Sequence, residues 1–537
     1  MIRPGRPGWE GSLLMSLERD TQKSCRTGKV YLVGAGPSDV ELITVKGKRL
    51  LEEAEVIVYD RLVGNGVLMW GSKNARYIDV GKRSGHHPIP QEEINQILVR
   101  EARKGQKVVR LKGGDPLVFG RGGEEAAVLE KAGIPFEIVP GITSAIGVPS
   151  YLGIPVTHRD LASSVHIVTA HKKDGSLPDI HYRSLAEGGG TIVFLMGVST
   201  LGSVMEGLLG EGMSPDMPAA VLERGTTAAQ RKIVGTVGTI AGKAARAKVQ
   251  SPAIILVGYV AAFRHMDWYE CRPLAGRKIL VTRPRERSSR LAAMLREEGA
   301  EVLELPTIRI APVTEGEPLS RALAGVEDFS WIVFTSPSGV RVFREELRKR
   351  RKDVRSLAHL KIAAIGEGTA GELEAWGFCP DLMPEQYDGD HLGEALAASV
   401  QAGEKVLIPR ARAGNQELVR RLEDAGARVT DLPIYDTEYE SFPWMDCERE
   451  FETGSCWAMF TSASTVRGFV RTAGGLDLSK VTALCIGEMT AGEAKRAGMR
   501  TFTAARATLR DLVDLALQMA VEEREDGEGQ SKPDGEK

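Results

Sequence analysis

The C-terminal half of this chain repeats itself, and the repeat restricts the folds that this half can adopt. ILVTRPRERSSRLAAMLREEGAEVLELPTI begins at Ile279, and a similar segment, VLIPRARAGNQELVRRLEDAGARVTDLPIY, begins at Val406. IVFTSPSGVRVF has a later counterpart in MFTSASTVRGF, and AAIGEGTAGELEAWGF has one in LCIGEMTAGEAKRAGM, at nearly the same spacing. Three matched blocks in one order are hard to obtain by chance, so we predict a pair of related α/β domains. A cleft between two such domains is the default ligand site.

The N-terminal half alternates short apolar segments with helical ones. From Lys29 onwards, KVYLVGAG and EVIVYD are typical of strands, and QEEINQILVREARKG has the spacing of an amphipathic helix. A second set of strands is expected at SVHIVTAH, GTIVFLMG, MPAAVLERG and PAIILVGYV, beyond the Gly- and Pro-rich segment VPGITSAIGVPSYLGIP. Strands that alternate with helices indicate an α/β fold with mostly parallel sheets, here in two subdomains.

These patterns divide the 537 residues into five segments. We expect one domain at 29–262, with subdomains at about 29–150 and 151–262, and a second domain at 277–518. Residues 263–276 show no periodicity and are predicted to be a linker. Residues 1–28 and 519–537 are polar or charged and are predicted to be disordered tails, and Met15 is a second candidate for the start of the protein.

Charge and cysteine content argue against several classes of protein. The net charge of -2 gives no sign of a nucleic-acid or membrane-surface partner. The six cysteines are scattered and do not combine with histidines at zinc spacing, so we expect reduced thiols and no metal site. No apolar run is long enough for a membrane-spanning helix, and the first residues do not form a signal peptide, so we expect a cytoplasmic protein.

Two glycine-containing segments are candidates for a ligand site. VGAGPSD, at 33–39, is a partial dinucleotide fingerprint, but its third glycine is replaced by Asp39 and Pro37 removes an amide donor. LKGGDPLVFGRGGEE, at 111–125, passes from a strand into a Gly-Gly-Asp-Pro turn and then into a helix. Asp115 falls where open α/β sheets bind ligands, although aspartate before proline is also a common turn former.

The order of blocks in the first domain resembles the tetrapyrrole methylase family. VGAGPSD, VYDRLV, VGKRSGHH, VVRLKGGDPLVFGRGGEE, VPGITSA, YLGIPVTHRD and SPAIILVG are similar to uroporphyrinogen-III C-methyltransferases over about 29–262. The resemblance implies that S-adenosylmethionine binds between two α/β subdomains and that the protein is a homodimer. The cofactor-binding residues that it implies are Pro37, Gly113, Gly114, Asp115, Val118, Thr143, Ser144, Met196 and Gly225. Ser38 and Ala170 stand where the family usually has glycine.

The same resemblance implies an acid/base pair, Asp60 and Lys82. Methyl transfer from a sulfonium is a displacement that depends on alignment, and a base must then take the proton that the substrate loses. A ribose-binding acid or a helix cap is the alternative for Asp60, and a ligand for substrate carboxylates is the alternative for Lys82. Uroporphyrinogen is a polyanion, so Arg61, Arg83 and Arg121 are candidate substrate-binding residues, each with a solvated basic surface as the alternative.

The second domain has repeated hydroxyl clusters instead of a compact catalytic motif. Each cluster follows an apolar strand and precedes a helix, a position typical of helix caps and also of carboxylate binding by backbone N–H groups. VTRP, FTSPSGV, AAIGEGTAGEL, VLIPR, IYDTEYE and FTSAST resemble uroporphyrinogen-III synthase over about 277–518. The resemblance implies two interleaved lobes joined by a two-stranded ladder, with the first and last parts of the domain in one lobe. It also implies closure of hydroxymethylbilane with inversion of ring D and loss of water.

Tyr435 matches the tyrosine that this second resemblance assigns to departure of the substrate hydroxyl. The alternative is a tyrosine in a cleft wall or in the core. The substrate-binding residues implied here are Thr282, Arg283, Thr335, Ser336, Arg410, Thr461, Ser462, Thr465 and Thr490.

The two halves predict consecutive steps on one chain. The second domain would make uroporphyrinogen III, and the first would methylate it twice to precorrin-2. The alternative is a dinucleotide-dependent oxidoreductase fused to a two-lobed ligand-binding domain, which could act as a sensor. Binding of S-adenosylmethionine against NAD, and the isomer formed from hydroxymethylbilane, distinguish these possibilities.

Overall fold

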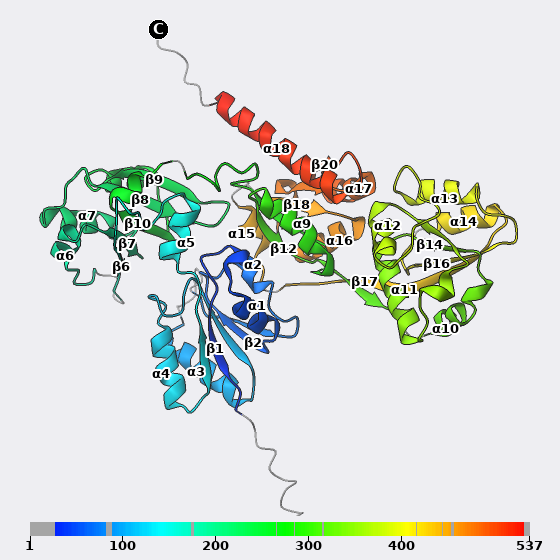
Figure 1. Ribbon diagram of the computed structural model, residues 1–537, viewed down its shortest axis with the longest axis horizontal. Coiled ribbons are helices and arrows are strands. Elements are labelled where there is room, and N and C mark those ends of the chain that lie inside the picture. The colour runs from blue at the N-terminus through cyan, green and yellow to red at the C-terminus, as the bar shows by residue number, and fades with distance from the viewer. Residues whose placement is uncertain are drawn as a thin grey trace, which may run out of the picture. The chain divides into compact units, whose positions relative to one another are not determined.

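The chain folds into two compact units, which meet in sequence at Trp268 and Tyr269. The structure is a computed structural model that describes residues 27–81, 89–172, 177–264, 266–283, 285–313, 316–414, 416–442, 444–452 and 456–530 (Figure 1). Each unit contains two five-stranded sheets with helices packed on them. The unit boundary lies within the segment that the sequence predicts as a linker.

The first sheet of unit 1 is entirely parallel, with the strand order β3-β2-β4-β1-β5. Its strands β2 and β4 are buried at every position, because helices cover both faces of such a sheet. The strands are β1 (Val30–Gly34), β2 (Val56–Tyr59), β3 (Arg76–Asp79), β4 (Val108–Lys112) and β5 (Phe136–Val139). The helices are α1 (Val45–Glu52), α2 (Asn65–Leu68), α3 (Gln91–Arg103), α4 (Gly122–Lys131) and α5 (Ser144–Tyr151).

The second sheet of unit 1 is mixed, with the order β6-β7-β10-β8-β9. Only the β6–β7 pairing is parallel, which corrects the expectation of mostly parallel sheets for this half. The reason is a short connection that makes β8 and β9 an antiparallel pair instead of a crossover unit. The strands are β6 (Val165–Thr169), β7 (Thr191–Leu195), β8 (Pro218–Glu223), β9 (Arg231–Thr236) and β10 (Ala253–Val257). The helices are α6 (Tyr182–Glu187), α7 (Leu201–Gly210) and α8 (Ile240–Arg246).

Unit 2 is built from two lobes with matching strand orders. One sheet runs β12-β11-β18-β19-β20 and the other β13-β17-β16-β14-β15, so that β12, β11, β18 and β19 correspond to β17, β16, β14 and β15. The strands are β11 (Lys278–Val281), β12 (Glu301–Glu304), β13 (Ile308–Pro312), β14 (Trp331–Phe334), β15 (Lys361–Ala364), β16 (Lys405–Ala411), β17 (Arg428–Tyr439), β18 (Cys456–Phe460), β19 (Thr482–Cys485) and β20 (Arg500–Thr503). The internal repeat in the sequence is thus the repeat of these two sheets.

The two repeats exchange strands between the lobes. β11 and β12 from the start of the unit share a sheet with β18, β19 and β20 from its end. An antiparallel ladder of Ile308–Pro312 with Tyr435–Tyr439 carries the chain out of this lobe and back into it (Figure 1). The interleaved arrangement and the two-stranded ladder are therefore as the sequence predicts.

Helices cover the sheets of unit 2. They are α9 (Arg285–Glu297), α10 (Glu317–Ala324), α11 (Pro337–Lys349), α12 (Glu367–Glu374), α13 (Gly389–Ala397), α14 (Glu417–Asp424), α15 (Cys447–Phe451), α16 (Ala463–Thr472), α17 (Glu488–Arg496) and α18 (Leu509–Gln530). Short 3-10 helices are η1 (Val40–Leu42), η2 (Tyr259–Ala262), η3 (Val326–Asp328), η4 (Val354–Leu357) and η5 (Leu478–Lys480). The prediction of a disordered tail from residue 519 is wrong up to Gln530, because α18 buries Met519 and Ala520 on the face that already buries Leu512 and Ala516.

Candidate functional site

Two loops at the carboxyl ends of neighbouring strands are joined in unit 1. Gly36 and Gly114 exchange backbone hydrogen bonds of 3.2 and 2.7 Å between the loops that follow β1 and β4. A Cβ atom added to Gly34 would lie 2.6 Å from the Cα of Gly141, so the loop after β5 also approaches closely. Gly114 has φ +68, a conformation that glycine adopts without strain. The three loops therefore present main-chain N–H and C=O groups at one edge of the sheet.

Asp115 organises these loops. Its carboxylate accepts hydrogen bonds from the N–H groups of Leu117 and Val118 in its own turn, at 2.8 and 3.2 Å. It also accepts one of 3.0 Å from the N–H of Gly141 in the loop after β5. The turn-forming interpretation of Asp115 is thus realised, and the residue fixes the backbone that surrounds the expected cofactor.

Strained backbone is concentrated at the same strand ends. Eight non-glycine residues in the described part of the chain have positive φ angles, and six of them follow β1, β4, β7 or β8. These six are Ser38, Phe119, Arg121, Met196, Arg224 and Thr226. Ser38, which stands where the resembling family has glycine, has φ +143. Such conformations persist where the surrounding structure holds them, and they gather at ligand sites.

The two subdomains meet around Asp39. The Asp39 N–H lies 3.4 Å from the Thr226 hydroxyl, and the Tyr151 hydroxyl donates to the Asp39 carboxylate at 2.7 Å. Gly225 packs so closely on α5 that an added Cβ would lie 2.3 Å from Val148 Cγ1. Tyr151 and Thr226 are not among the residues predicted from the sequence, because both act through contacts with Asp39, which lies far away along the chain.

The remaining cofactor candidates lie around these loops. Thr143 and Ser144 start α5, and the backbone N of Ser144 would lie 3.7 Å from a Cβ on Gly114. Gly113 packs against Leu62, and Pro37 against Gly147. Val118 is half-buried, and Met196 exposes 48% of its surface at the end of β7. The structure thus brings the candidates of both subdomains to the carboxyl ends of β1, β4, β5, β7 and β8.

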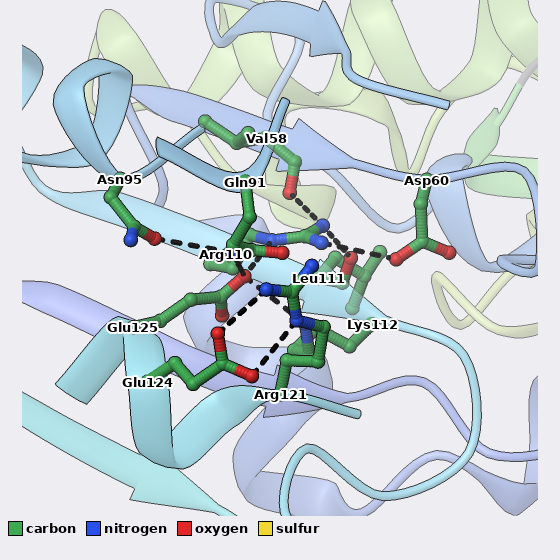
Figure 2. A network of polar contacts seen from close by, with 10 residues as sticks. All are labelled: Val58, Asp60, Gln91, Asn95, Arg110, Leu111, Lys112, Arg121, Glu124 and Glu125. Atoms are coloured by element: carbon green, nitrogen blue, oxygen red, sulfur yellow. Dashed lines mark hydrogen bonds and ion pairs between the residues drawn. The ribbon is translucent and has the colours of Figure 1, made fainter. Parts of the chain in front are cut away.

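A buried charge cluster lies behind this edge (Figure 2). Arg110 of β4 donates to Asp60, which follows β2, at 3.2 Å, and to Glu125 of α4 at 3.2 Å. Lys112, also of β4, donates to the same Glu125 oxygen at 3.1 Å. Burial, together with repulsion from Arg110, lowers the pKa of Lys112. We call Asp60, Arg110, Lys112 and Glu125 the buried charge cluster.

Asp60 is the exposed end of the buried charge cluster. Its side chain is 26% exposed, whereas those of Arg110, Lys112 and Glu125 are almost completely buried. Its other oxygen accepts a hydrogen bond from the N–H of Leu62 at 3.1 Å. The carboxylate is thereby held at a strand end with one side turned outwards.

The basic residues predicted near Asp60 differ in their exposure and in their contacts. Lys82 and Arg83 lie outside the described residues. Arg61 is exposed and packs on Gly81. Arg121, the N-cap residue of α4, is exposed and forms a bidentate ion pair with Glu124 of that helix, at 2.9 and 2.6 Å. Glu125 was not expected as a site residue, and the only sign of it in the sequence is a glutamate within the glycine-rich block.

In unit 2, several predicted hydroxyls cap helices or bond to the backbone. Thr282 is fully buried and donates to the carbonyl of Met459 at 2.8 Å. Ser462 and Thr465 form a reciprocal capping box at the start of α16. Thr490 is buried in the first turns of α17, and Thr335 and Thr461 are half-buried at the ends of β14 and β18. The helix-cap interpretation is therefore realised for Ser462 and Thr465.

Tyr435 lies beside a capping serine. Its hydroxyl is 2.8 Å from the Oγ of Ser336, which also accepts the N–H of Gly339 as the N-cap of α11. Arg410 is buried and forms two hydrogen bonds of 2.6 Å with Asp431, so its charge is already balanced within the lobe. Those hydrogen bonds, opposed by burial, lower the pKa of Asp431.

Arg283 differs from Arg410 because two of its nitrogens have no acceptor among the described residues. Its Nε and Nη1 are buried, and neither has a hydrogen-bond acceptor in the structure described here. Burial, and the nearby charge of Arg341 on α11, lower the pKa of Arg283 to about 10. A buried guanidinium without an acceptor is costly, and a carboxylate ligand would remove that cost.

No helix in the described part of the chain combines the length and the apolar composition that a bilayer crossing requires. Among the same residues, no group of three or more histidine, cysteine, aspartate or glutamate side chains is arranged to hold a metal ion.

Both halves match known families. Residues 29–241 match the family described as tetrapyrrole (corrin/porphyrin) methylases, and residues 289–514 match the family described as uroporphyrinogen-III synthase HemD. "Porphyrin biosynthesis protein HemD" of Ruminiclostridium josui is 44% identical over 92% of this chain and 98% of that protein. An S-adenosyl-L-methionine-dependent uroporphyrinogen III methyltransferase of Methanosarcina barkeri is 55% identical over 43% of this chain and 92% of its own length.

A solved structure is also similar to the first half. It is the uroporphyrin-III C-methyl transferase of Thermus thermophilus complexed with S-adenyl homocysteine. The two sequences are 42% identical over 44% of this chain and 99% of that chain, with a TM-score of 0.39.

Proposed function

The chain belongs to the tetrapyrrole methylases through its first unit and to the uroporphyrinogen-III synthases through its second, and we propose how its residues serve the two reactions. It is a bifunctional uroporphyrinogen-III synthase and S-adenosylmethionine-dependent uroporphyrinogen-III C-methyltransferase of tetrapyrrole biosynthesis. The observation that carries this conclusion is the presence of both families in one chain, in the same order as in a relative that it matches over nearly its whole length.

In this proposal, unit 2 closes hydroxymethylbilane to uroporphyrinogen III with inversion of ring D, and unit 1 methylates the product twice to precorrin-2. We further propose that the protein is a cytoplasmic homodimer assembled through unit 1. The dinucleotide-dependent oxidoreductase is set aside, since both halves match families of tetrapyrrole enzymes.

The residues at the edge of unit 1 fit S-adenosylmethionine. Close-packed glycine loops offer main-chain groups to its amino-acid end, and the exposed apolar side chains of Met196, Leu117 and Phe119 suit contact with an adenine ring. Pro37, Gly113, Gly114, Asp115, Val118, Thr143, Ser144, Met196 and Gly225 would hold it, with Asp115 acting through the backbone that it fixes. When bound, the cofactor supplies an electrophilic methyl group on a sulfonium.

Asp60 is the proposed base of the methylation. Methylation of a pyrrole carbon leaves a cation, which is neutralised when a neighbouring C–H bond breaks and its electron pair stays in the macrocycle. The Asp60 carboxylate takes the proton, and its hydrogen bonds from Arg110 and Leu62 orient it for that transfer. Arg61 and Arg121 lie on exposed surface beside this edge and are proposed to bind substrate carboxylates, as are Lys82 and Arg83.

Tyr435 and Arg283 have the proposed main roles in ring closure. The Tyr435 hydroxyl donates to the substrate hydroxyl as it leaves as water, and Ser336 fixes the phenol through its 2.8 Å contact. Arg283 binds a substrate carboxylate through its Nε and Nη1, two buried donors that have no acceptor among the residues that the structure describes. The hydroxyl-capped helix starts that follow β14 and β18 offer N–H groups to further carboxylates.

Product analysis tests the assignment. Purified protein is incubated with hydroxymethylbilane, with and without S-adenosylmethionine, and the products are separated by chromatography after oxidation. We expect the type III isomer without the cofactor and a dimethylated product with it. If only the spontaneously cyclised type I isomer forms, the synthase assignment is wrong; if uroporphyrinogen III accumulates unmethylated, the methyltransferase assignment is wrong.

A further inference from the structure

Glu125 is a fully buried carboxylate whose two oxygens differ in their hydrogen bonds. Its Oε1 accepts from Arg110, Lys112 and Gln91 at 3.2, 3.1 and 3.0 Å. Its Oε2 is also buried and has no partner in the part of the chain that the structure describes. Figure 2 shows Arg110, Lys112 and Gln91 gathered around this one side chain. Three donors on one oxygen hold two cations at fixed positions, so Glu125 has a larger role than a single ion pair.

The buried charge cluster is electrically balanced when all four of its members are ionised. Arg110 and Lys112 contribute two positive charges, and Glu125 and Asp60 contribute two negative ones. Charges in a poorly solvated interior interact more strongly than charges at the surface, because little water screens them. When Asp60 takes a proton, the balance is lost, and the remaining carboxylate of Glu125 alone offsets the two cations.

We propose that Glu125 is a positioning residue of the methylation reaction, which acts through Arg110 and Lys112 on the proton transfer to Asp60. It holds the guanidinium that orients Asp60, and its negative charge keeps the two cations from over-stabilising the ionised form of that base. This inference rests on the proposed role of Asp60. It assigns a function in the reaction to a residue that touches neither substrate nor cofactor.

The variants of Glu125 and Lys112 leave the other polar and charged residues near Asp60 unsubstituted. Arg61 follows Asp60 in the chain and Asp79 ends β3, the strand beside β2, and both residues pack on Gly81. Gln91 of α3 donates to Asn95 at 3.1 Å and to Glu125 at 3.0 Å, but both Gln91 and Asn95 are neutral and contribute no charge of their own. Because these groups are unchanged in variants of Glu125 and Lys112, any change in the pH dependence reports on the buried charge cluster.

The test uses two substitutions of opposite charge. Glu125→Gln removes a negative charge and keeps the shape, so it should move the acid limb of the pH–rate profile of methylation to lower pH by about one unit. The maximal rate should fall about tenfold, since the base is weaker. Lys112→Gln removes a positive charge and should move the acid limb to higher pH by about the same amount. The double variant, which is again balanced, should return the limb to within a few tenths of a unit of the wild-type position.

Glu101→Gln is the matched control. Glu101 is also a completely buried carboxylate of unit 1 with three cationic partners, Arg76, Arg100 and Lys104, but it lies on α3 away from Asp60. A merely structural effect of losing a buried carboxylate should appear in this variant as well, as lower stability with an unchanged acid limb. Binding of S-adenosylmethionine, measured by equilibrium dialysis, should remain intact in all four variants.

The outcomes separate this inference from the proposed function. Acid limbs that move in the same direction in both single variants, or that do not move, overturn the role of Glu125. If Glu125→Gln does not fold, the test rests on Lys112→Gln alone. An acid limb of its pH–rate profile that stays at the wild-type position then overturns the proposed role of Glu125. If Asp60→Asn retains full methylation, the proposed base itself is wrong, whatever the Glu125 variants show.

Discussion

The Oγ of Ser336 and the hydroxyl of Tyr435 lie 2.8 Å apart, although 99 positions separate the two residues in the chain. Ser336 caps α11, which follows β14, and Tyr435 lies in β17 where the ladder between the lobes begins. The contact therefore joins a helix start of one repeat to the strand on which the chain returns to the other lobe. Ser336 thus caps α11 and also lies in the proposed synthase site.

Replacing Tyr435 by phenylalanine should slow ring closure and leave methylation unchanged. The phenol is the proposed donor to the departing hydroxyl, and loss of a positioned proton donor typically reduces a rate 10²- to 10⁴-fold, roughly. The measurement is formation of uroporphyrinogen III from hydroxymethylbilane, with methylation of added uroporphyrinogen III as the internal control. Ser336→Ala should give a smaller loss, because the phenol remains. An undiminished rate in Tyr435→Phe would assign the residue to packing.

Replacing Asp60 by asparagine should impair methylation and leave ring closure unchanged. The amide keeps the shape and can still bond to Arg110, but it cannot take the proton of the methylated substrate. We expect methylation to fall by about 10²-fold or more while ring closure remains at the wild-type rate. Methyl transfer from labelled S-adenosylmethionine is the direct measurement. Wild-type methylation in this variant would remove Asp60 from the mechanism and leave it the role of a structural ion-pair partner.

Local patterns predicted most of the fold, because strands and turns depend on neighbouring residues. The run from β4 through the Gly-Gly-Asp-Pro turn into α4 is an example, and Asp115 does form that turn. The repeat further predicted two similar sheets. The disordered tail was predicted to start at residue 519, which is too early. The apolar residues Met519 and Ala520 stand next to the charged end of α18, so the helical pattern is not evident in the sequence there.

Long-range contacts could not be predicted in the same way. Arg110 and Lys112 alternate with apolar residues in β4, but the sequence does not show that this strand is fully buried or that Glu125 of α4 neutralises both cations. Likewise, the pairing of Arg410 with Asp431 depends on how the neighbouring strands β16 and β17 pair, and the lack of an acceptor for Nε and Nη1 of Arg283 among the described residues depends on the packing around the end of β11. Sequence spacing contains neither fact.

Replacing Arg283 by methionine should stabilise the free protein and impair the synthase. Removing a buried guanidinium with unmet donors relieves a desolvation cost, so the free energy of unfolding should rise by about 1 kcal/mol. The same change should raise the KM for hydroxymethylbilane at least about tenfold, because a charged hydrogen bond to the substrate is lost. Thermal unfolding and steady-state kinetics measure the two effects. A variant with lower stability and an unchanged KM would show that Arg283 is a structural residue.

The described cysteines should fall into two classes of reactivity. Burial raises the pKa of Cys447 to about 11 and that of Cys485 to about 12, and it raises the pKa of Cys456 further. Because the thiolate is the reactive form, all three should resist iodoacetamide at pH 8 in the native protein. Cys271 and Cys379 are exposed and should react. Mass spectrometry of peptides, before and after unfolding, checks the pattern, and labelling of Cys456 in native protein would contradict it.

Glu101 should make unit 1 sensitive to acid. Burial alone would raise the pKa of this carboxyl, but hydrogen bonds from Lys104 and Arg100, with the nearby charge of Arg76, lower it overall. A carboxyl whose pKa is lower in the folded than in the unfolded chain stabilises the fold at neutral pH, and that contribution disappears as the pH falls through the folded-state pKa. Glu101→Gln should therefore lower the unfolding midpoint of unit 1 at pH 7.

The difference between Glu101→Gln and wild type should stay constant from pH 7 down to the unfolded-state pKa of a glutamate, about 4.3, and narrow as the pH falls below it. As the pH falls through the folded-state pKa, the wild-type carboxyl also becomes protonated, so both proteins then lack the same ion pairs to Arg76, Arg100 and Lys104. Denaturant unfolding at a series of pH values, followed by a signal from unit 1, measures the effect. A difference that is constant with pH would mean that Glu101 stabilises α3 through shape and hydrogen bonding alone, with no net contribution from its charge.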